Sequence, residues 1–190
     1  MSGETTLDLE AYLARIGYDG PLAQTLETLQ GLHYAHALSI PFENLDVLAK
    51  RPILLDLASL QKKLVREKRG GYCFEVNALF AAVLKELGFD VTTLIGRVRW
   101  MSPEEVDTAR SHMLMRVELP EGSYLADVGF GGLTMTGPIR FDTGIEQQTP
   151  HEPRRLLTHE DGFELQAKIA GDWTPIYRFT MEPHRRTDYE

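Results

Sequence analysis

Hydrophobic residues recur at helical spacing through the first ninety positions of the chain. The spacing predicts four helices, the first ending at Gly17 and the second beginning at Pro21, which suits a first helical position. The fourth runs from Cys73 to Leu87 and ends at Gly88, and because apolar residues cover most of its faces we expect it to be buried. The apolar positions of the four stretches are Leu7, Leu9, Leu13 and Ile16; Leu22, Leu26, Leu29 and Leu32; Leu57, Leu60, Leu64 and Val65; and Phe74, Ala78, Leu79, Ala82, Val83, Leu84 and Leu87.

From Asp90 onward the pattern changes to short segments that are rich in β-branched and aromatic residues, several of them alternating. Gly and Pro signals separate the segments, at Pro120-Glu121-Gly122, Asp161-Gly162 and Gly171-Asp172. No long helical pattern lies between them, so an antiparallel sheet or barrel is favoured over a doubly wound sheet. We therefore predict an α+β protein that changes from helix to strand near residue 90. The expected strands are VTTLIGRVRW, HMLMRVEL, SYLADVGF, FELQAKIA and TPIYRFTM.

Length and composition are those of a soluble globular protein of one full domain or two small ones. The 190 residues are 43% hydrophobic and 25% charged, and 20 Lys and Arg against 28 Asp and Glu give a net charge of −8. This acidity argues against a nucleic-acid or membrane partner. No apolar run is long enough to span a membrane, and MSGETTLDLEAY does not resemble a signal sequence. A single cysteine excludes an internal disulfide and favours a reducing cytoplasm.

The last four residues, Thr187-Asp188-Tyr189-Glu190, fit a capping box, the pattern that begins a helix. No helix follows them in the sequence. We take this as a sign that the chain is a shortened form of a longer protein, although a four-residue pattern with two loose positions also recurs by chance.

The single cysteine, Cys73, lies in Arg69-Gly70-Gly71-Tyr72-Cys73-Phe74-Glu75, directly at the start of the most apolar helix. The positive end of a helix dipole favours a thiolate, and backbone N–H groups at a helix start can stabilise an oxyanion. The paired glycines allow a tight turn and a close approach. These features describe a nucleophile and an ordinary buried cysteine equally well.

A nucleophilic cysteine needs a base, and the base needs a group to orient it. His112 opens one expected strand and Asp127 ends the next, so a hairpin through Pro120-Glu121-Gly122 would place the two residues opposite each other. Such a pair beside Cys73 would complete a Cys-His-Asp triad, whereas a lone strand histidine is more often structural. The full set of candidate histidines is His33, His36, His112, His151, His159 and His184.

Three other groups of residues have ordinary explanations beside functional ones. His33 and His36 have a helical spacing that suits a shared metal, but no third ligand lies nearby, and we favour an ordinary helix surface. Before the cysteine stands a basic cluster that is typical of a solvated helix face and that would also attract a phosphorylated cofactor. The glycine-rich run from Gly129 to Gly132 could offer backbone amides to a pyrophosphate, but glycine-rich turns are common and the signal alone is weak. The basic cluster consists of Lys62, Lys63, Arg66, Lys68 and Arg69.

Four segments together resemble the arylamine N-acetyltransferase family: HALSIPFENLDV, RGGYCFEVN, SHMLMRV and YLADVGFGG. They follow in order, and the resemblance extends from about His33 to the last residue. It implies a helical first domain over residues 1–89, a β-barrel second domain over residues 90–190, and a papain- or transglutaminase-like Cys-His-Asp active site between them. Members of the family continue through a helix into a C-terminal α/β lid, which we expect this chain to lack.

Carried over residue by residue, the resemblance makes Cys73 the acetyl-accepting nucleophile, His112 its base and Asp127 the orienting acid. Phe42 and Phe130 resemble aromatic residues that line the acceptor pocket of the family. The expected coenzyme contacts are Gly131, Gly132 and Thr134, and the expected structural charged residues near the site are Glu43, Arg69 and Glu75.

The activity that the resemblance implies is ping-pong transfer of an acetyl group from acetyl-CoA, through Cys73, to an arylamine, arylhydrazine or hydroxyarylamine. No metal is expected, and the family context is cytoplasmic xenobiotic metabolism. Without a lid, water would compete as the acceptor and shift the reaction towards acetyl-CoA hydrolysis. Two alternatives stay open: a cysteine hydrolase or transglutaminase-like enzyme, and an inactive binding remnant. The acceptor amine and the oligomeric state are left open as well.

Overall fold

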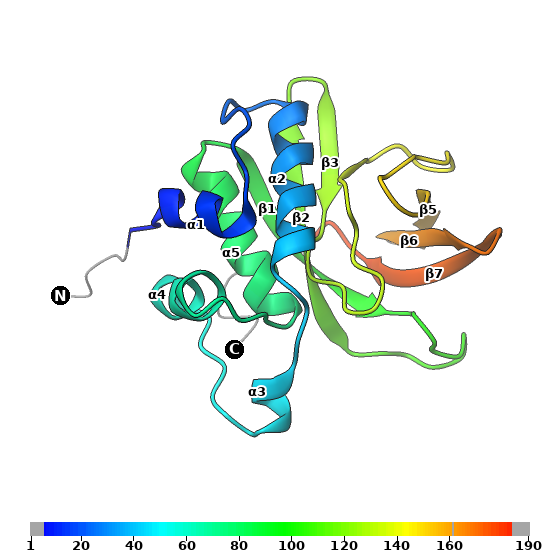
Figure 1. The fold of residues 1–190 in the computed structure, drawn as a ribbon. Coiled ribbons are helices and arrows are strands. Elements are labelled where there is room, and N and C mark those ends of the chain that lie inside the picture. Colours follow the sequence, from blue (N-terminus) through cyan, green and yellow to red (C-terminus); the bar gives the residue numbers. More distant parts are fainter. Residues whose placement is uncertain (1–5, 161, 184–190) are drawn as a thin grey trace.

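The chain forms helices first and strands afterwards in the computed structural model, which describes residues 6–160 and 162–183 (Figure 1). The helices are α1 (Leu9–Ile16), α2 (Leu26–Ser39), α3 (Leu45–Leu48), α4 (Leu57–Leu60), a π-helical continuation η1 (Gln61–Arg66), and α5 (Cys73–Glu86). The strands are β1 (Asp90–Val98), β2 (Arg110–Leu119), β3 (Gly122–Ala126), β4 (Ile139–Arg140), β5 (Arg154–His159), β6 (Gly162–Ile169) and β7 (Asp172–Phe179). The predicted α+β order, with the change near residue 90, is confirmed.

Local capping decides where the helices begin and end. The Asp8 side chain accepts a hydrogen bond from the Ala11 backbone N–H at the start of α1, and Gly17 ends that helix with a left-handed φ of 67°. The sequence pattern predicts that the second helix begins at Pro21, but in the structure it begins at Leu26. The reason is that Thr25 accepts from the Thr28 backbone N–H and so provides the N-cap.

Three short elements did not follow from the sequence pattern. The four residues of α3 expose Leu45 and Leu48 instead of burying an apolar stripe. The strand β4 has only two residues, and β5 contains a fully buried arginine, Arg154, where an apolar residue would mark a strand. A hydrophobic pattern cannot reveal elements of this length and composition.

The seven strands form one antiparallel sheet in the order β4-β3-β2-β1-β7-β6-β5. The segment after β4 approaches β5 through isolated bridges between Thr143 and Leu156 and between Gln147 and Arg154. The sheet is therefore a nearly closed barrel, which confirms the predicted antiparallel barrel. The turn at Pro120-Glu121-Gly122 joins β2 to β3 as expected, because Leu119 and Gly122 are paired.

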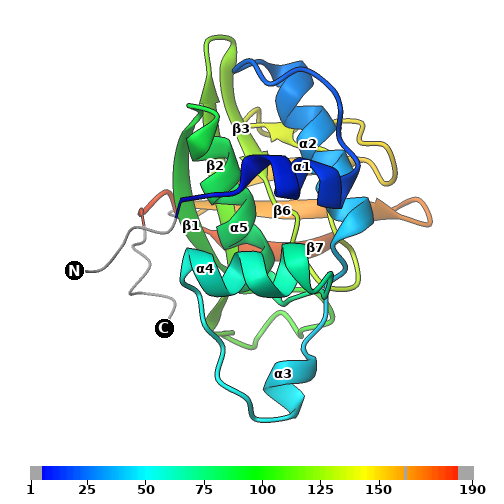
Figure 2. The ribbon, with the colours of Figure 1, turned by 60° about the vertical axis from the view of Figure 1, so that its left-hand side comes forward.

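Helix α5 packs between the other helices and the sheet, against β1 and β2 (Figure 2). Its residues Val76, Leu79, Phe80, Val83 and Leu84 have no exposed surface, as predicted for the most apolar helix. They share one hydrophobic cluster with α1, α2 and residues of β1–β3, while a second cluster fills the barrel interior. Because the first cluster crosses the boundary near residue 90, the division into two domains at that point stays a prediction.

The features at the C-terminus lie outside the part of the chain that the structure describes. These are the expected capping box at 187–190 and His184; Asp161, in one of the expected turns, also lies outside the described residues. Within residues 6–160 and 162–183, none of the helices has the length and apolar character needed to cross a bilayer.

Candidate active site

Cys73 is the first residue of α5 and lies where that helix meets the barrel. Tyr72 is the N-cap, and its backbone N–H donates to the Glu75 carboxylate at 3.1 Å, which fixes the first turn. The thiol is 7% exposed and its Sγ lies 3.5 Å from the Ser111 carbonyl oxygen at the start of β2. Gly129 packs closely on the other side, because a Cβ there would lie 3.0 Å from the Cys73 Cα.

The structure brings His112 and Asp127 together, although by a different register from the one expected. Pairing of Met115 with Ala126 in β2 and β3 places Asp127 just beyond the end of β3, diagonal to His112 rather than directly opposite it. The side chains still meet, with His112 Nε2 at 2.7 Å from Asp127 Oδ2. Side chains two residues apart across a sheet remain within reach, so the diagonal placement preserves the contact.

Asn77 is a further residue of this site that the sequence analysis did not identify. Its amide nitrogen donates to Asp127 Oδ1 at 2.9 Å and to the Met113 carbonyl at 2.7 Å. Its amide oxygen accepts from the Val128 backbone N–H at 2.9 Å. Asn77 lies four positions after Cys73, and therefore on the same face of α5; this spacing was the available signal.

The protonation states of His112 and Asp127 depend on each other. Burial alone would raise the pKa of Asp127, but the charge of His112 and hydrogen bonds from His112, Asn77 and the Gly129 backbone N–H lower it well below its usual range. Burial alone would lower the pKa of His112, but the Asp127 charge and hydrogen bond, together with the contact to Cys73, raise it instead. The pair therefore favours an imidazolium beside a carboxylate.

Aromatic rings enclose His112 on two sides. The Phe130 ring meets the His112 ring edge-on, with 5.1 Å between the ring centroids. The centroid of the Tyr177 ring lies 4.9 Å from that of His112, and the two ring planes are inclined at 34°. Phe130 is only 5% exposed, so in this structure it packs against the histidine. Phe42, in contrast, is 41% exposed, and its ring covers the backbone of Gly131, where a Cβ would lie 2.5 Å from Phe42 Cε1.

The expected coenzyme contacts lie in the loop that follows Asp127. Gly132 has a φ of 90°, a conformation that favours glycine, and no atom lies within 4 Å of the position that a Cβ would take. Thr134 donates from its hydroxyl to the Phe130 carbonyl at 2.8 Å, which closes the loop on itself.

His33 and His36 are fully buried in α2, so the expectation that they form an ordinary helix surface is wrong. His33 Nε2 accepts from the Asp127 backbone N–H at 3.2 Å, and His36 Nδ1 pairs with the Tyr12 hydroxyl at 2.8 Å. The α2 sequence is polar on several faces, and the packing of α1 and α5 around it decides the burial. Among the described residues, no group of three or more His, Cys, Asp and Glu is placed to hold a metal.

A fully buried arginine, Arg154 of β5, lies behind this site. Its guanidinium donates to the Leu133 carbonyl at 2.9 Å and lies 3.5 Å from the Glu152 carboxylate. Burial lowers the pKa of Arg154, while the negative charges of Glu152 and Asp127 oppose the shift. Arg154 therefore adds a positive charge to the surroundings of Asp127.

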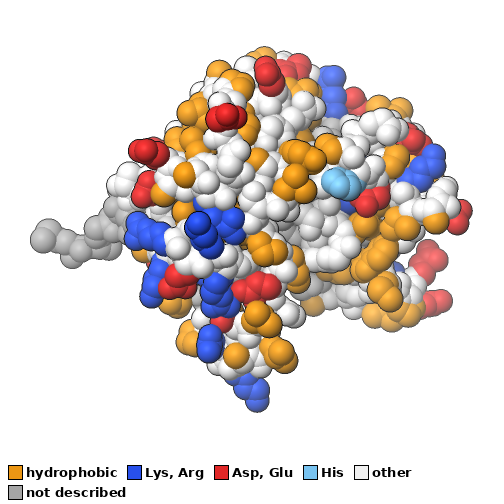
Figure 3. Space-filling model, viewed as in Figure 1, with side chains coloured by type: hydrophobic (Ala, Val, Ile, Leu, Met, Phe, Trp, Pro, Cys, Tyr) orange, Lys and Arg blue, Asp and Glu red, His pale blue; other side chains and the backbone are white. Residues whose placement is uncertain are grey.

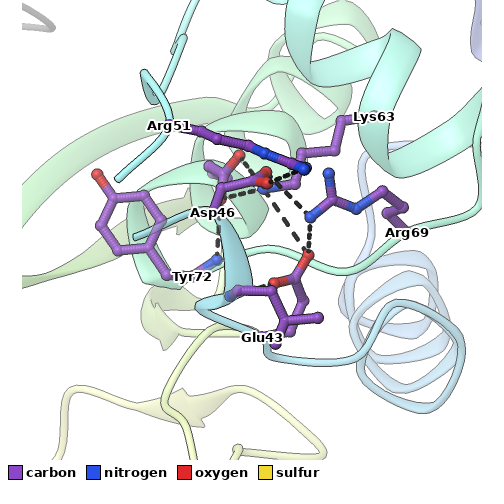
Figure 4. A network of polar contacts seen from close by, with 8 residues as sticks. Glu43, Asp46, Arg51, Lys63, Arg69 and Tyr72 are labelled. Carbon is purple, nitrogen blue, oxygen red and sulfur yellow. Dashed lines mark hydrogen bonds and ion pairs between the residues drawn. The ribbon is translucent and has the colours of Figure 1, made fainter. Parts of the chain in front are cut away.

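Glu43, Arg69 and Glu75, the expected structural charged residues, lie in one ion-pair network beside the start of α5. Figure 4 shows Glu43 and Arg69 of this network with Lys63 and Asp46. Lys63 is its centre, since its Nζ lies 2.7 Å from Glu75 Oε1 and 2.8 Å from Asp46 Oδ2. Arg69 pairs with Glu43 at 2.8 Å and with Asp46 at 3.0 Å. The network ties the segment around Glu43 to the turn before Cys73, where the Glu43 N–H also donates to the Gly71 carbonyl at 2.9 Å.

The basic cluster before Cys73 therefore divides in two. Lys63 and Arg69 turn inward to the network, whereas Lys62, Arg66 and Lys68 are exposed. Figure 3 shows Lys and Arg side chains gathered on the part of this face formed by α3 and α4. The exposed part fits the expected solvated helix face.

The central place of Lys63 predicts a specific loss of stability. Replacing it by Met removes the cation that pairs with the Glu75 carboxylate, which is only 3% exposed, while Arg69 still pairs with Glu43 and Asp46. We expect Lys63→Met to lower the free energy of unfolding by about 3 kcal/mol, measured by urea denaturation. The control is Lys62→Met, because Lys62 is 72% exposed and lies 3.8 Å from Glu67; it should change stability by less than about 0.5 kcal/mol. Equal effects at the two positions would contradict the role of Lys63.

The buried histidines predict a loss of stability in mild acid. Burial, assisted by the positive charge of Arg15, lowers the pKa of His36 to about 3. The unfolded chain binds this proton below about pH 6.5, so stability falls as the pH drops from there towards the folded value. His36→Asn removes the titration and keeps a polar atom near the Nδ1 position, facing Tyr12. Between pH 7 and pH 5 we expect wild type to lose about 2 kcal/mol more than this variant in urea unfolding. Parallel pH dependence of the two proteins would refute the assignment.

Comparisons with known proteins bear on this arrangement of residues. A family model described as N-acetyltransferase matches residues 25–190. The arylamine N-acetyltransferase of Mycolicibacterium smegmatis is 49% identical over 188 residues, covering 97% of this chain and 68% of that protein. The Escherichia coli K12 enzyme of the same name is 47% identical over 181 residues, covering 95% of this chain and 64% of the relative. The chain thus spans about two thirds of the length of these relatives.

Solved structures agree with the sequence comparisons. The Mycobacterium marinum arylamine N-acetyltransferase in complex with CoA matches with a TM-score of 0.93 at 44% identity, covering 96% of this chain and 68% of that chain. Fold, sequence and the resemblance of the four motifs lead to the same family. The chain belongs to the arylamine N-acetyltransferases.

Proposed function

We propose that this chain transfers an acetyl group from acetyl-CoA to an arylamine, arylhydrazine or hydroxyarylamine by a ping-pong reaction through Cys73. The observation that carries the proposal is the 2.7 Å contact between His112 Nε2 and Asp127 Oδ2, buried beside the cysteine that begins α5. A thiol, an imidazole and an orienting carboxylate are the groups that thiol-based acyl transfer needs. The names of the relatives support an arylamine acceptor, and the CoA in the M. marinum complex supports the donor class.

In the first half-reaction, His112 takes the proton from Cys73 Sγ, and the thiolate attacks the acetyl carbonyl carbon of acetyl-CoA. The tetrahedral intermediate collapses with cleavage of the bond to the coenzyme sulfur, which leaves with a proton from His112. Because Nε2 is bound to Asp127, Nδ1 is the ring nitrogen that exchanges this proton. One thioester replaces another of similar energy, which suits sulfur as the nucleophile.

In the second half-reaction, the amine nitrogen attacks the carbonyl carbon of acetyl-Cys73. The amine proton passes to His112 and then to the departing Sγ, which restores the thiol and releases the amide. Asp127 holds the imidazole in the tautomer that serves both steps and stabilises the imidazolium. An aromatic amine is neutral and nucleophilic near pH 7, so it needs no prior deprotonation.

The substrate contacts in this proposal follow from exposure. Phe42 offers an exposed ring on which the aromatic acceptor can pack. Phe130 is buried and packs against the His112 ring. We assign the donor to the loop of Gly131, Gly132 and Thr134, where the open backbone at Gly132 leaves room for its approach. The exposed lysines and arginine near Cys73 would attract the donor phosphates to an otherwise acidic protein.

The direct test is to trap the intermediate. Incubation with acetyl-CoA should add one acetyl group to Cys73, detected by intact-mass and peptide mass spectrometry, and an arylamine should then remove it with formation of the amide. Cys73→Ala should show neither acetylation nor turnover while keeping its fold. Acetyl-CoA hydrolysis without any amide would instead indicate a hydrolase, and failure to acetylate Cys73 would refute the proposal.

The role of Asp127 predicts a second result. Asp127→Asn keeps the shape of the side chain but removes the charge that fixes the His112 tautomer. We therefore expect kcat/KM to fall by about three to four orders of magnitude, measured in a coupled acetyl-transfer assay. Asp172→Asn, at the exposed first residue of β7, is the matched control and should retain wild-type activity. Near-normal turnover in Asp127→Asn would contradict the triad.

A further inference from the structure

The backbone of Asp127 is held by two different helices. Its own N–H donates to His33 Nε2 of α2 at 3.2 Å, and the next N–H, of Val128, donates to Asn77 Oδ1 of α5 at 2.9 Å. Both His33 and Asp127 have no exposed surface. Asp127 lies beyond the end of β3, so its position depends on these contacts from the helices rather than on pairing within the strand.

We propose that His33 is a positioning residue, which accepts the Asp127 backbone N–H and thereby fixes the carboxylate against His112. The inference rests on the proposed function, because positioning has a catalytic consequence only if His112 and Cys73 act as described above. Nothing in the helical pattern of α2 distinguishes this histidine from its neighbours; the contact to residue 127, across 94 positions of sequence, identifies it.

The hydrogen bond requires one particular form of the His33 ring. To accept an N–H, Nε2 must carry a lone pair, so the ring is neutral with its proton on Nδ1. Nδ1 has no hydrogen-bond partner among the described residues. The His33 and Phe80 rings pack edge to face, with 5.7 Å between their centroids. The polar interaction that accounts for a histidine at this buried position is therefore the one with Asp127.

Burial keeps the His33 ring in that neutral form. Burial lowers its pKa to about 4; Arg154 of β5 adds to the shift, and Asp127 opposes it. The neighbouring His36 of α2 is itself held neutral by burial. His33 therefore remains a neutral acceptor across the pH range in which a thiol and an imidazole exchange a proton.

Losing the acceptor leaves a buried N–H without a partner, which is unfavourable unless the peptide rotates to find another one. Rotation of the peptide at residue 127 would move the carboxylate that Asn77 Nδ2 and Gly129 N–H hold at 2.9 Å each. The contact between Asp127 and His112 would loosen, and with it the stabilisation of the imidazolium that favours the Cys73 thiolate.

The test compares His33→Leu, His33→Gln and His33→Asn. Leucine cannot accept a hydrogen bond, the Gln Oε1 reaches the place of Nε2, and Asn is too short to do so. The readout is the rate of Cys73 alkylation by iodoacetamide as a function of pH, which needs no acetyl-CoA. In His33→Leu and His33→Asn we expect the midpoint of the profile to rise by about one pH unit, with alkylation below the midpoint slower by about tenfold. His33→Gln should stay within about twofold of wild type at each pH.

The matched control is His36→Leu, which removes the neighbouring buried histidine and its contact to Tyr12 but leaves Asp127 untouched. It should lose stability without moving the alkylation profile. An unchanged profile in His33→Asn, or an equal shift in His36→Leu, would overturn the proposal. If His33→Leu does not fold, the difference between the alkylation profiles of His33→Gln and His33→Asn tests the proposal. Failure of wild type to form acetyl-Cys73 would refute the acetyl transfer alone, since the alkylation contrast measures the positioning separately.

Discussion

The carboxylate of Asp127 is fully buried, and the arrangement of the site follows from the need to stabilise that charge. A buried carboxylate is strongly unfavourable unless it is paired and hydrogen-bonded. Here His112 supplies the partner charge, and Asn77 and the Gly129 N–H complete the coordination. These groups come from β2, α5 and the loop after β3. Helix and barrel must therefore meet in one orientation for the charge to be satisfied, and that same orientation places Cys73 beside His112.

A second electrostatic arrangement holds the other end of the site. Lys63 joins three carboxylates from two places in the chain, Glu43 and Asp46 in one segment and Glu75 in the first turn of α5. The hydrogen bond from the Tyr72 N–H to Glu75 extends this network into the first turn of α5. The start of the helix is thus held by charges, whereas its apolar residues pack against β1 and β2. Because ion pairs hold its first turn and apolar packing holds the rest, α5 can carry a reactive residue at its end.

The titrations of the buried groups limit the pH range in which the fold is most stable. His33 and His36 have lowered pKa values in the folded protein. The free energy of unfolding therefore decreases as the pH falls below about 6.5, because the unfolded chain binds protons that the folded chain does not. His112 has a raised pKa; its contribution is complete below the unfolded value and is lost as the pH rises through the folded one. The two effects oppose each other, which places the most favourable range near neutral pH, where thiol-imidazole chemistry also operates.

The sequence by itself determined the α+β order, the start of α5 at Cys73, the turn between β2 and β3, and the family, because apolar periodicity and short motifs are local properties. It also singled out Cys73, His112 and Asp127 as residues to be examined together. Only the tertiary structure decided the diagonal register of His112 and Asp127, the short strands β4 and β5, and the roles of Asn77, Lys63 and Arg154 as partners. His33 and His36 show the reason. Their spacing along α2 shows only that they share one face of the helix. They are buried because α1, α5 and the loop carrying Asp127 close around them, which is a property of residues distant in sequence.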